Sequence, residues 1–376
     1  MTVNEKVKLI SRFTEEVMTP DDLACLLSKN TPLNHYIGFE ISGKIHIGTG
    51  LMCMQKVKDF NDAGIKCHIF LADWHTWIND KLGGDRNAIG RVAVGYFKEG
   101  MSAAYKCLGG NPNDLNFILG SELYNNNDDY WKTVIEVSKH TSLSRMQRSI
   151  DILGRKEGRG VDFAKLIYPA MQVADIFAMQ IHFPHAGSDQ RKAQVIARDV
   201  AKKLTIMPLI AKGEIVKPAA VHHHLILGLQ KPSVWPIPSE IDRHELWSSM
   251  KMSKSKPDSA VFIHDSEEDI KRKVMKAFCP EKETGFNPII DWVEYLIFSR
   301  EKSITIKREP MHGGDLKIKN IEELKKLFQK GELHPQDLKK FVAEYLANLL
   351  KPIRGHFSKG KPKKMLGELE KILKTT

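Results

Sequence analysis

Short apolar runs alternate with stretches of helical periodicity along the first 150 residues of the chain. Runs rich in apolar, β-branched and aromatic residues predict strands over 34–43, 67–73 and 115–121. Apolar residues at helical spacing predict helices over 46–63, 89–108 and 130–152. This alternation of strand and helix predicts an α/β, doubly wound fold, in which buried strands run parallel to one another.

Several polar residues stand where the expected strands end. In a doubly wound sheet, ligands bind beyond the carboxyl ends of the strands. This placement predicts a site close to four side chains, those of Glu40, Asp73, His75 and Glu122.

The second half of the chain has a different pattern. Residues 206–245 are rich in proline and carry irregular apolar patches, which predicts a connecting segment, and residues 251–257 predict a polar loop. Periodicity then predicts helices over 267–279, 288–299, 321–329 and 336–350, with a small ribbon inside 303–319. The last helix has one apolar stripe, made by Leu338, Phe341, Val342, Tyr345, Leu346, Leu349 and Ile353. We therefore expect an α/β domain over 1–248, a loop and linker over 249–264, and a mostly helical domain over 265–376.

Composition narrows the classes of protein that fit. No apolar run approaches the roughly 18 residues that a membrane-spanning helix needs, and the charged N-terminal segment lacks the apolar core of a signal peptide. We expect a cytoplasmic protein that does not enter membranes. The five cysteines are scattered and form no C-x-x-C pair, so we expect free thiols and neither disulfides nor a protein-bound metal.

The positive charge of the chain is uneven. The formal net charge is +11, and residues 301–376 hold 18 Lys and Arg against 10 Asp and Glu, which is +8 of that total. A basic C-terminal fifth indicates a polyanionic partner. A solvated, solubilising surface explains the same charge, and charge alone leaves both interpretations open.

Two short motifs suggest nucleotide chemistry. His46-Ile47-Gly48-Thr49 stands at an expected strand-to-helix turn, and Lys251-Met252-Ser253-Lys254-Ser255 follows much later in the chain. The turn offers backbone N–H groups to an anion, and Gly48 lets a nucleotide approach the backbone. His46 and Thr49 add hydrogen-bond donors. Lys251 and Lys254 add cationic donors on a loop that can close over a pyrophosphate group, although such lysines are also found on solvated loops.

In this order and at this spacing, the two motifs resemble the signature motifs of the class I aminoacyl-tRNA synthetases. The resemblance implies ATP as a substrate, accompanied by Mg²⁺. It implies that ATP is bound by His46, Gly48, Met252, Ser253, Lys254 and Ser255. It also implies that charge on the reacting phosphates is stabilised by His46, Thr49, Lys251 and Lys254.

A third motif, Leu166 to Asp175, concerns the other substrate. Pro169 suits the first position of a helix, and Tyr168, Gln172 and Asp175 then lie on one face among apolar neighbours. A buried carboxylate needs a hydrogen-bond donor, and a phenolic hydroxyl is one. A helix cap or an internal hydrogen bond would also satisfy Asp175.

Five segments together resemble the archaeal and eukaryotic type of tyrosyl-tRNA synthetase: 36–46, 70–75, 166–175, 189–192 and 334–339. The likeness runs from about Tyr36 to Ile353. It implies a Rossmann-like doubly wound catalytic domain, followed by a mostly helical C-terminal anticodon-binding domain, in a homodimer that binds L-tyrosine, ATP and tRNA(Tyr). It implies that Tyr36 and Asp175 bind the substrate hydroxyl, that Tyr168, Gln172 and Gln190 bind its amino group, and that Phe70, Ala72 and His75 line the pocket. Transfer RNA would be contacted by Arg191, Lys192, His312, His334 and Asp337.

The chain departs from the family pattern at Thr49, where His is common, and at Ser188 and His312, where Met and Phe are expected. Residues His222 to His224 match no motif, and we expect them to have a structural or loop role. Three other functions compete: a tryptophanyl-tRNA synthetase, a non-catalytic tRNA-binding relative, and another nucleotidyltransferase. Because a phenolic oxygen both donates and accepts hydrogen bonds, Tyr36 together with Asp175 favours tyrosine.

Overall fold

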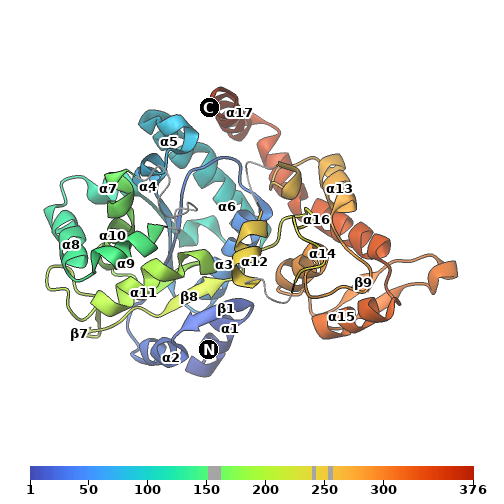
Figure 1. Cartoon of the computed structure of the whole chain (residues 1–376), viewed down its shortest axis with the longest axis horizontal. Helices are drawn as coiled ribbons and strands as arrows, with labels where there is room; N and C mark the ends of the chain where they lie inside the picture. Colours follow the sequence, from blue (N-terminus) through green and yellow to red (C-terminus); the bar gives the residue numbers. More distant parts are fainter. Residues whose placement is uncertain (151–161, 239–242, 253–256) are drawn as a thin grey trace.

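A six-stranded sheet forms the centre of the N-terminal part of the protein (Figure 1). The computed structural model describes residues 1–150, 162–238, 243–252 and 257–376. The strands lie in the order β1 (Thr14–Met18), β8 (Ala220–His223), β5 (Phe183–Gly187), β2 (Asn34–Phe39), β3 (Lys66–Leu71) and β4 (Leu115–Leu119). All neighbouring strands pair in parallel except β1 with β8. The α/β, doubly wound fold expected from the sequence is confirmed.

Alternate residues of the parallel strands enter different cores. Tyr36 and Phe70 join one apolar cluster, with residues of α8, α10 and α11, while Ile37 and Ile69 join a larger cluster that includes α3 and α6. Helices therefore cover both faces of the sheet, which explains why the predicted strands carry apolar residues on both faces. The chain leaves β2 for β3 on one side and returns in β5 on the other, so a crevice opens where the strand order reverses.

The predicted helices of the N-terminal part are present, with breaks that periodicity does not reveal. The helix expected over 46–63 is η1 (Gly48–Cys53) continued by α3 (Met54–Asp62). The one expected over 89–108 is α5 (Arg86–Val92), η3 (Ala93–Phe97) and α6 (Lys98–Cys107). The one expected over 130–152 ends early: α8 (Asp128–Lys139) is followed by α9 (Leu143–Arg148), and residues 151 and 152 lie outside the described part. The pattern did not predict the strands β1 and β5. The helices that it did not predict are α1 (Val3–Ser11), α2 (Pro20–Ser28), α4 (Asp73–Ile78), η2 (Lys81–Gly84), η4 (Pro112–Asp114), α7 (Gly120–Tyr124), η6 (Ser188–Gln190) and α11 (Arg191–Val200).

The prediction that Pro169 begins a helix is wrong. Helix α10 runs over Phe163–Ala178 and begins after Asp162, whose carboxylate caps it by accepting a hydrogen bond of 3.2 Å from the backbone N–H of Lys165. Pro169 lies in the helix interior, where it removes one backbone donor. The cap at Asp162 and the buried apolar face fix the start of the helix, and the proline is accommodated within it.

The segment 206–245, which we expected to be a connection, contributes a strand to the central sheet. It contains the two-stranded ribbon of β6 (Ile210–Ala211) and β7 (Glu214–Ile215), and then β8, which lies between β5 and β1. β8 was missed because it has only four residues and two of them, His222 and His223, are histidines. Helix α12 (Arg243–Met250) follows, and η7 (Pro257–Ser259) comes after the undescribed residues.

The C-terminal part is mostly helical, as predicted. Its elements are α13 (Glu267–Lys276), α14 (Pro288–Trp292), η8 (Val293–Ile297), β9 (Ile304–Ile306), η9 (Pro310–His312), β10 (Leu316–Ile318), α15 (Ile321–Lys330) and α16 (Pro335–Phe357). β9 and β10 form the expected ribbon. α16 extends beyond the predicted end at residue 350, and the predicted stripe packs inward, with Leu338, Val342 and Leu346 fully buried.

The last helix, α17 (Gly360–Thr375), returns to the N-terminal part and lies beside α5 at the top of the view (Figure 1). Leu369 is fully buried in this contact. Glu370 forms an ion pair of 2.6 Å with Lys44, and Glu368 forms one of 2.8 Å with Arg91. Among the described residues, no helix is both long enough and apolar enough to cross a membrane.

Two leucines of α17 allow a matched test of this contact. Leu369 is 0% exposed and Leu373 is 37% exposed. We expect Leu369→Ala to lower the free energy of unfolding by about 2 kcal/mol or more, through lost burial and a cavity, and Leu373→Ala to lower it by less than about 1 kcal/mol. Urea denaturation followed by circular dichroism measures both. Equal effects would show that α17 is not held by this buried leucine.

Candidate active site

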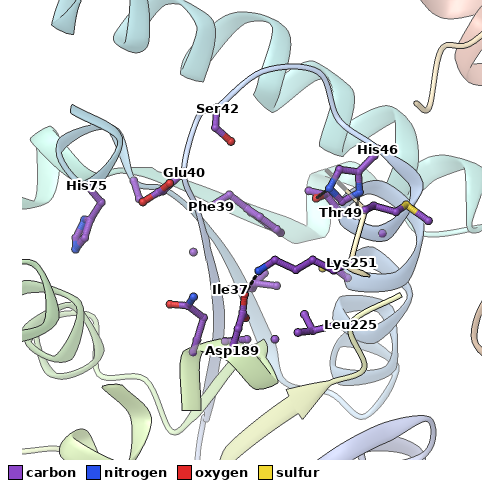
Figure 2. A pocket seen from close by; sticks show the side chains of 18 of the residues that line it. Ile37, Phe39, Glu40, Ser42, His46, Thr49, His75, Asp189, Leu225 and Lys251 are labelled. Atoms are coloured by element: carbon purple, nitrogen blue, oxygen red, sulfur yellow. Dashed lines mark hydrogen bonds and ion pairs between the residues drawn. The ribbon is translucent and has the colours of Figure 1, made fainter. Parts of the chain in front are cut away.

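A cavity of about 1090 Å³ opens at the crevice between β2 and β5 (Figure 2). Its walls come from the carboxyl ends of β2, β3 and β5, from α10, and from the segments on either side of α12. The cavity brings together many of the site residues expected from the sequence: Tyr36, Glu40, His46, Gly48, Thr49, Phe70, Ala72, His75, Tyr168, Gln172, Asp175, Gln190, Lys251 and Met252.

Two of the four polar residues expected near the site have other positions. The carboxylate of Asp73 accepts hydrogen bonds from the backbone N–H groups of Trp74, at 3.0 Å, and Ser121, at 2.9 Å. It thereby fixes the turn after β4. Glu122 is exposed and does not line the cavity. Both follow strand ends, but their side chains turn away from the crevice, which strand position alone does not reveal.

Asp175 lies at one end of the cavity and is 1% exposed. Its Oδ1 atom accepts hydrogen bonds from the phenol hydroxyls of Tyr124 and Tyr130, each at 3.0 Å. Burial raises the pKa of Asp175 to about 8, although the two phenols act in the opposite direction. The sequence analysis missed Tyr124 and Tyr130. The available signal was the buried carboxylate itself, which required donors from other elements.

Tyr36 faces the same cavity from β2. Its ring packs edge-on against Phe70, with centroids 6.3 Å apart, and burial together with the nearby charge of Asp175 raises the pKa of its hydroxyl. The two residues therefore share one end of one cavity, although they come from β2 and α10. This end combines an apolar wall with a hydroxyl and a carboxylate.

His75 completes this end of the cavity as a neutral ring. Its Nε2 atom lies 3.7 Å from Oδ2 of Asp175, and its ring meets that of Tyr168 edge-on at 4.5 Å. Burial lowers the pKa of His75 to about 3, so the imidazole carries no charge at neutral pH and forms no ion pair with Asp175.

A second group of polar side chains lies beside this end. The Tyr168 hydroxyl donates to Oε1 of Glu40 at 2.8 Å, and the side-chain amide of Asn79 donates to the same oxygen at 3.0 Å. Gln172 donates to Oε1 of Gln190 at 3.3 Å, while its own buried Oε1 has no hydrogen-bond partner among the described residues. An acceptor buried without a donor costs free energy, so a ligand N–H group would be favoured here.

The turn at His46 forms the opposite end. The backbone N–H of Thr49 donates to Nδ1 of His46 at 3.3 Å, and the Thr49 hydroxyl lies 3.5 Å from Nε2 of the same ring. A side chain at Gly48 would meet the His46 ring at 3.0 Å, so glycine lets the imidazole fold over the start of η1. Thr49, the residue at which the motif departs from the family pattern, is thus in contact with His46.

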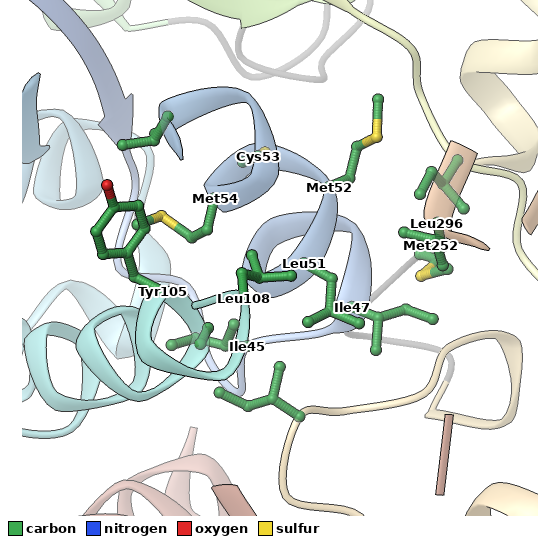
Figure 3. Packing of buried hydrophobic residues seen from close by; sticks show 14 of the residues in the cluster. Ile45, Ile47, Leu51, Met52, Cys53, Met54, Tyr105, Leu108, Met252 and Leu296 are labelled. Carbon is green, nitrogen blue, oxygen red and sulfur yellow. The ribbon is translucent and has the colours of Figure 1, made fainter. Parts of the chain in front are cut away.

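Backbone pairing brings the lysine motif to this turn. Ile47 N–H donates to the carbonyl of Val261 at 2.9 Å, and Ile263 N–H donates to the carbonyl of Ile45 at 3.0 Å. Figure 3 shows buried Met252 close to Ile47 and Leu296. In Figure 2, Lys251 extends into the space between His46 and Asp189 and forms an ion pair with Asp189. Ser253, Lys254 and Ser255 lie outside the described residues.

The residues expected to contact tRNA lie apart from the cavity. Arg191 forms two hydrogen bonds with Glu16, at 2.8 and 2.9 Å, and Lys192 donates to the carbonyl of Arg148 at 2.9 Å. His334 caps α16 by accepting from Gln336 N–H at 3.2 Å, and Asp337 stands in the first turn of that helix. The side chain of His312 lies outside the described part. Among the described residues, no group of three or more His, Cys, Asp or Glu side chains is arranged to hold a metal ion.

Comparison with known proteins identifies the family. Residues 28–351 match the family model of the class I tRNA synthetases (W and Y). A tyrosine–tRNA ligase of Thermococcus sibiricus is 57% identical over 361 residues, covering 96% of this chain and 96% of that protein. The crystal structure of a tyrosyl-tRNA synthetase from Pyrococcus horikoshii, complexed with L-tyrosine, is 54% identical, superposes with a TM-score of 0.95, and is matched over 99% of this chain and 100% of that one.

The same comparisons separate the alternatives left open by the sequence. A tryptophanyl-tRNA synthetase from Aeropyrum pernix is 19% identical, covers 93% of this chain and 84% of that one, and has a TM-score of 0.65, which shows a shared fold alone. The relatives that match at high identity over nearly the whole chain are enzymes named for tyrosine. The chain belongs to the tyrosine–tRNA ligases, within the class I tRNA synthetases.

Proposed function

We propose that the cavity binds L-tyrosine with its phenol hydroxyl between Tyr36 and Asp175, and with its amino group at Tyr168, Gln172 and Gln190. The observation that carries this proposal is the polarity of the cavity. One end holds a buried acid beside a phenol, and the other holds the His46 turn and Lys251. Phe70, Ala72 and His75 line the cavity and would contact the aromatic ring of tyrosine, with His75 beside Asp175.

The order of groups in the cavity fits ATP-dependent activation. The carboxylate oxygen of tyrosine attacks the α-phosphorus of ATP, a new C(O)O–P bond forms, and the bond to pyrophosphate breaks. The protein needs no nucleophile of its own, because it aligns two substrates and stabilises charge on the phosphates. His46, Thr49, Lys251 and Lys254 supply that stabilisation, and Gly48, Met252, Ser253 and Ser255 shape the ATP site. Mg²⁺ accompanies ATP as part of that substrate.

In the second step, a hydroxyl of the terminal ribose of tRNA(Tyr) attacks the tyrosyl carbonyl and AMP leaves. Arg191 and Lys192 follow β5 at the carboxyl edge of the sheet, which supports a role for them in binding the acceptor end of the RNA. His334 and Asp337 stand at the start of α16, and with His312 they would read the anticodon. We also propose that the enzyme acts as a homodimer, as the resemblance to tyrosyl enzymes implies.

Selectivity for tyrosine follows from the hydroxyl pocket. Phenylalanine would leave the polar groups of Tyr36 and Asp175 without the partner that the tyrosine hydroxyl supplies. We therefore expect Tyr36→Phe to lower kcat/KM for tyrosine about 10-fold, and to leave kcat/KM for phenylalanine unchanged. Pyrophosphate exchange with each amino acid measures this ratio. Tyr105→Phe is the matched control, since Tyr105 is buried (1% exposed, against 3% for Tyr36) but lies in the other core. Equal losses for both amino acids would contradict the assignment of Tyr36.

The lysine motif should act on the phosphates and not on tyrosine. We expect Lys251→Ala and Lys254→Ala each to slow adenylate formation by about 100-fold or more, while the Kd for tyrosine stays within about twofold. Rapid-quench measurement of tyrosyl-adenylate and calorimetric titration with tyrosine test the two halves. Lys231→Ala, a lysine outside this cavity, is the control. Unchanged adenylate formation in both motif variants would remove these lysines from the mechanism.

Tyrosine affinity should depend on pH through Asp175. Since the pKa of Asp175 is raised to about 8, this carboxyl group is mostly protonated in the free enzyme at neutral pH. A substrate hydroxyl that donates to the carboxylate favours the ionised form, so binding releases a proton at lower pH. We expect the Kd for tyrosine to fall as pH rises towards 8, by up to about 10-fold per pH unit, and to level off above. Asp175→Asn should remove the dependence. A Kd for the unaltered enzyme that is constant over this range would contradict ionisation of Asp175 on binding.

A further inference from the structure

The three adjacent histidines of β8 and its end, His222 to His224, each have different partners. His222 Nδ1 lies 3.0 Å from Glu16, and His223 Nδ1 lies 2.8 Å from Nε2 of His185. His224 contacts two carboxylates, those of Glu15 and Asp291. The alternation along the strand sends neighbouring side chains to opposite sides, so the three do not form one site.

His224 joins three parts of the chain. Its Nδ1 bonds the carboxylate of Glu15 in β1, and its Nε2 lies 2.6 Å from Oδ1 of Asp291 in α14. Its ring stacks on Tyr295, with centroids 3.8 Å apart and planes inclined by 10°. His224 is 4% exposed and Asp291 is 6% exposed, so the contact between these two side chains is screened from water, while Glu15 meets His224 from the more exposed side.

The bridge continues to the segment that carries Lys251. The second oxygen of Asp291, Oδ2, accepts the backbone N–H of Leu227 at 2.9 Å, and the indole N–H of Trp292 donates to the carbonyl of Leu227 at 2.8 Å. Leu227 in turn forms an antiparallel bridge with Lys251.

Backbone hydrogen bonds on both sides of Leu227 hold the same segment. Gly228 N–H donates to the carbonyl of Met250 at 2.6 Å, and Met252 N–H donates to the carbonyl of Ile226 at 3.3 Å. The backbone around Lys251 is therefore paired with residues 226–228, and Asp291 holds Leu227 at the middle of that segment.

We propose that Glu15, His224 and Asp291 form a buried bridge that positions Lys251 for the phosphates of ATP, so that His224 and Asp291 are positioning residues for amino-acid activation. The inference rests on the role proposed above for Lys251. Of the three, His224 also lines the cavity, whereas Glu15 and Asp291 do not. Their effect passes through Leu227 and the backbone of residues 250–252.

The charge state of His224 agrees with this role. Burial by itself would lower the pKa of His224, but Asp291 and Glu15 outweigh burial and raise the pKa to about 9. The ring is then protonated at neutral pH, and each of its two N–H groups donates to a carboxylate. Removing one partner would leave a buried charge without its counter-charge, which is destabilising.

A double-mutant cycle tests the proposal. We expect Asp291→Asn to slow adenylate formation by about 10-fold or more, because a small displacement of an aligned group has a large kinetic cost. In a Lys251→Ala background, the same substitution should change the rate by less than about twofold, since its effect passes through the missing lysine. The Kd for tyrosine should stay unchanged in every variant. Rapid-quench kinetics and calorimetry on the full-length enzyme supply the two readouts.

Asp59→Asn is the matched control. Asp59 is 2% exposed and bridges Lys56 and Arg12, so its loss removes a buried ion pair that does not lead to Lys251. It should lower stability and leave the rate of adenylate formation unchanged. Should Asp291→Asn fail to fold, Glu15→Gln weakens the same bridge from its more exposed side, where the Glu15 side chain is 40% exposed. We expect it to slow adenylate formation in the same direction, and only when Lys251 is present.

Three results would overturn the proposal: an unchanged rate in folded Asp291→Asn or Glu15→Gln, an equal slowing with and without Lys251, or an equal slowing in Asp59→Asn. Failure of the proposed function looks different. In that case Lys251→Ala alone leaves adenylate formation unchanged, before any change to the bridge is made.

Discussion

The active site depends on the backbone pairing of residues 45–47 with residues 261–263. These few hydrogen bonds, with Met252 buried against the same region, bring together the two motifs proposed to bind phosphates, although about 200 residues separate them in sequence. Without this pairing, the His46 turn would have no lysine opposite it. With it, the cavity has one cationic end, and the buried acid at Asp175 makes the other end distinct.

The sequence predicted elements where one physical signal dominates. The apolar runs of β2 and β3 could be recognised because residues on both faces are buried, and that of β4 because its partly buried residues pack against both cores. The stripe of α16 could be recognised because its spacing is helical. β8 could not, because it is short and its histidines are satisfied by tertiary partners. The prediction at Pro169 failed because proline often begins a helix, whereas here the cap at Asp162 and the packing of α10 fix an earlier start.

In the site, too, some residues could be predicted from the sequence and others could not. The residues that the family resemblance assigns to tyrosine and ATP line one cavity, with Ser253, Lys254 and Ser255 outside the described residues. The partners of these residues were not predictable, because each comes from a distant element: Tyr124 and Tyr130 for Asp175, and Asp189 for Lys251. A sequence motif identifies the side chain that contacts a ligand. The side chains that hydrogen-bond to that side chain when no ligand is bound come from distant elements, so they are known only from the complete fold.

The two phenols on Asp175 have a consequence for anyone redesigning the pocket to accept another amino acid. Exchanging the acid for an apolar residue leaves the buried hydroxyls of Tyr124 and Tyr130 with only their longer contacts, each of 3.4 Å, to Nδ1 of His75 and to the carbonyl of Met171. A single substitution at Asp175 thus weakens two hydrogen bonds that do not involve the ligand. A redesign for another amino acid therefore has to treat Asp175, Tyr124 and Tyr130 as one unit.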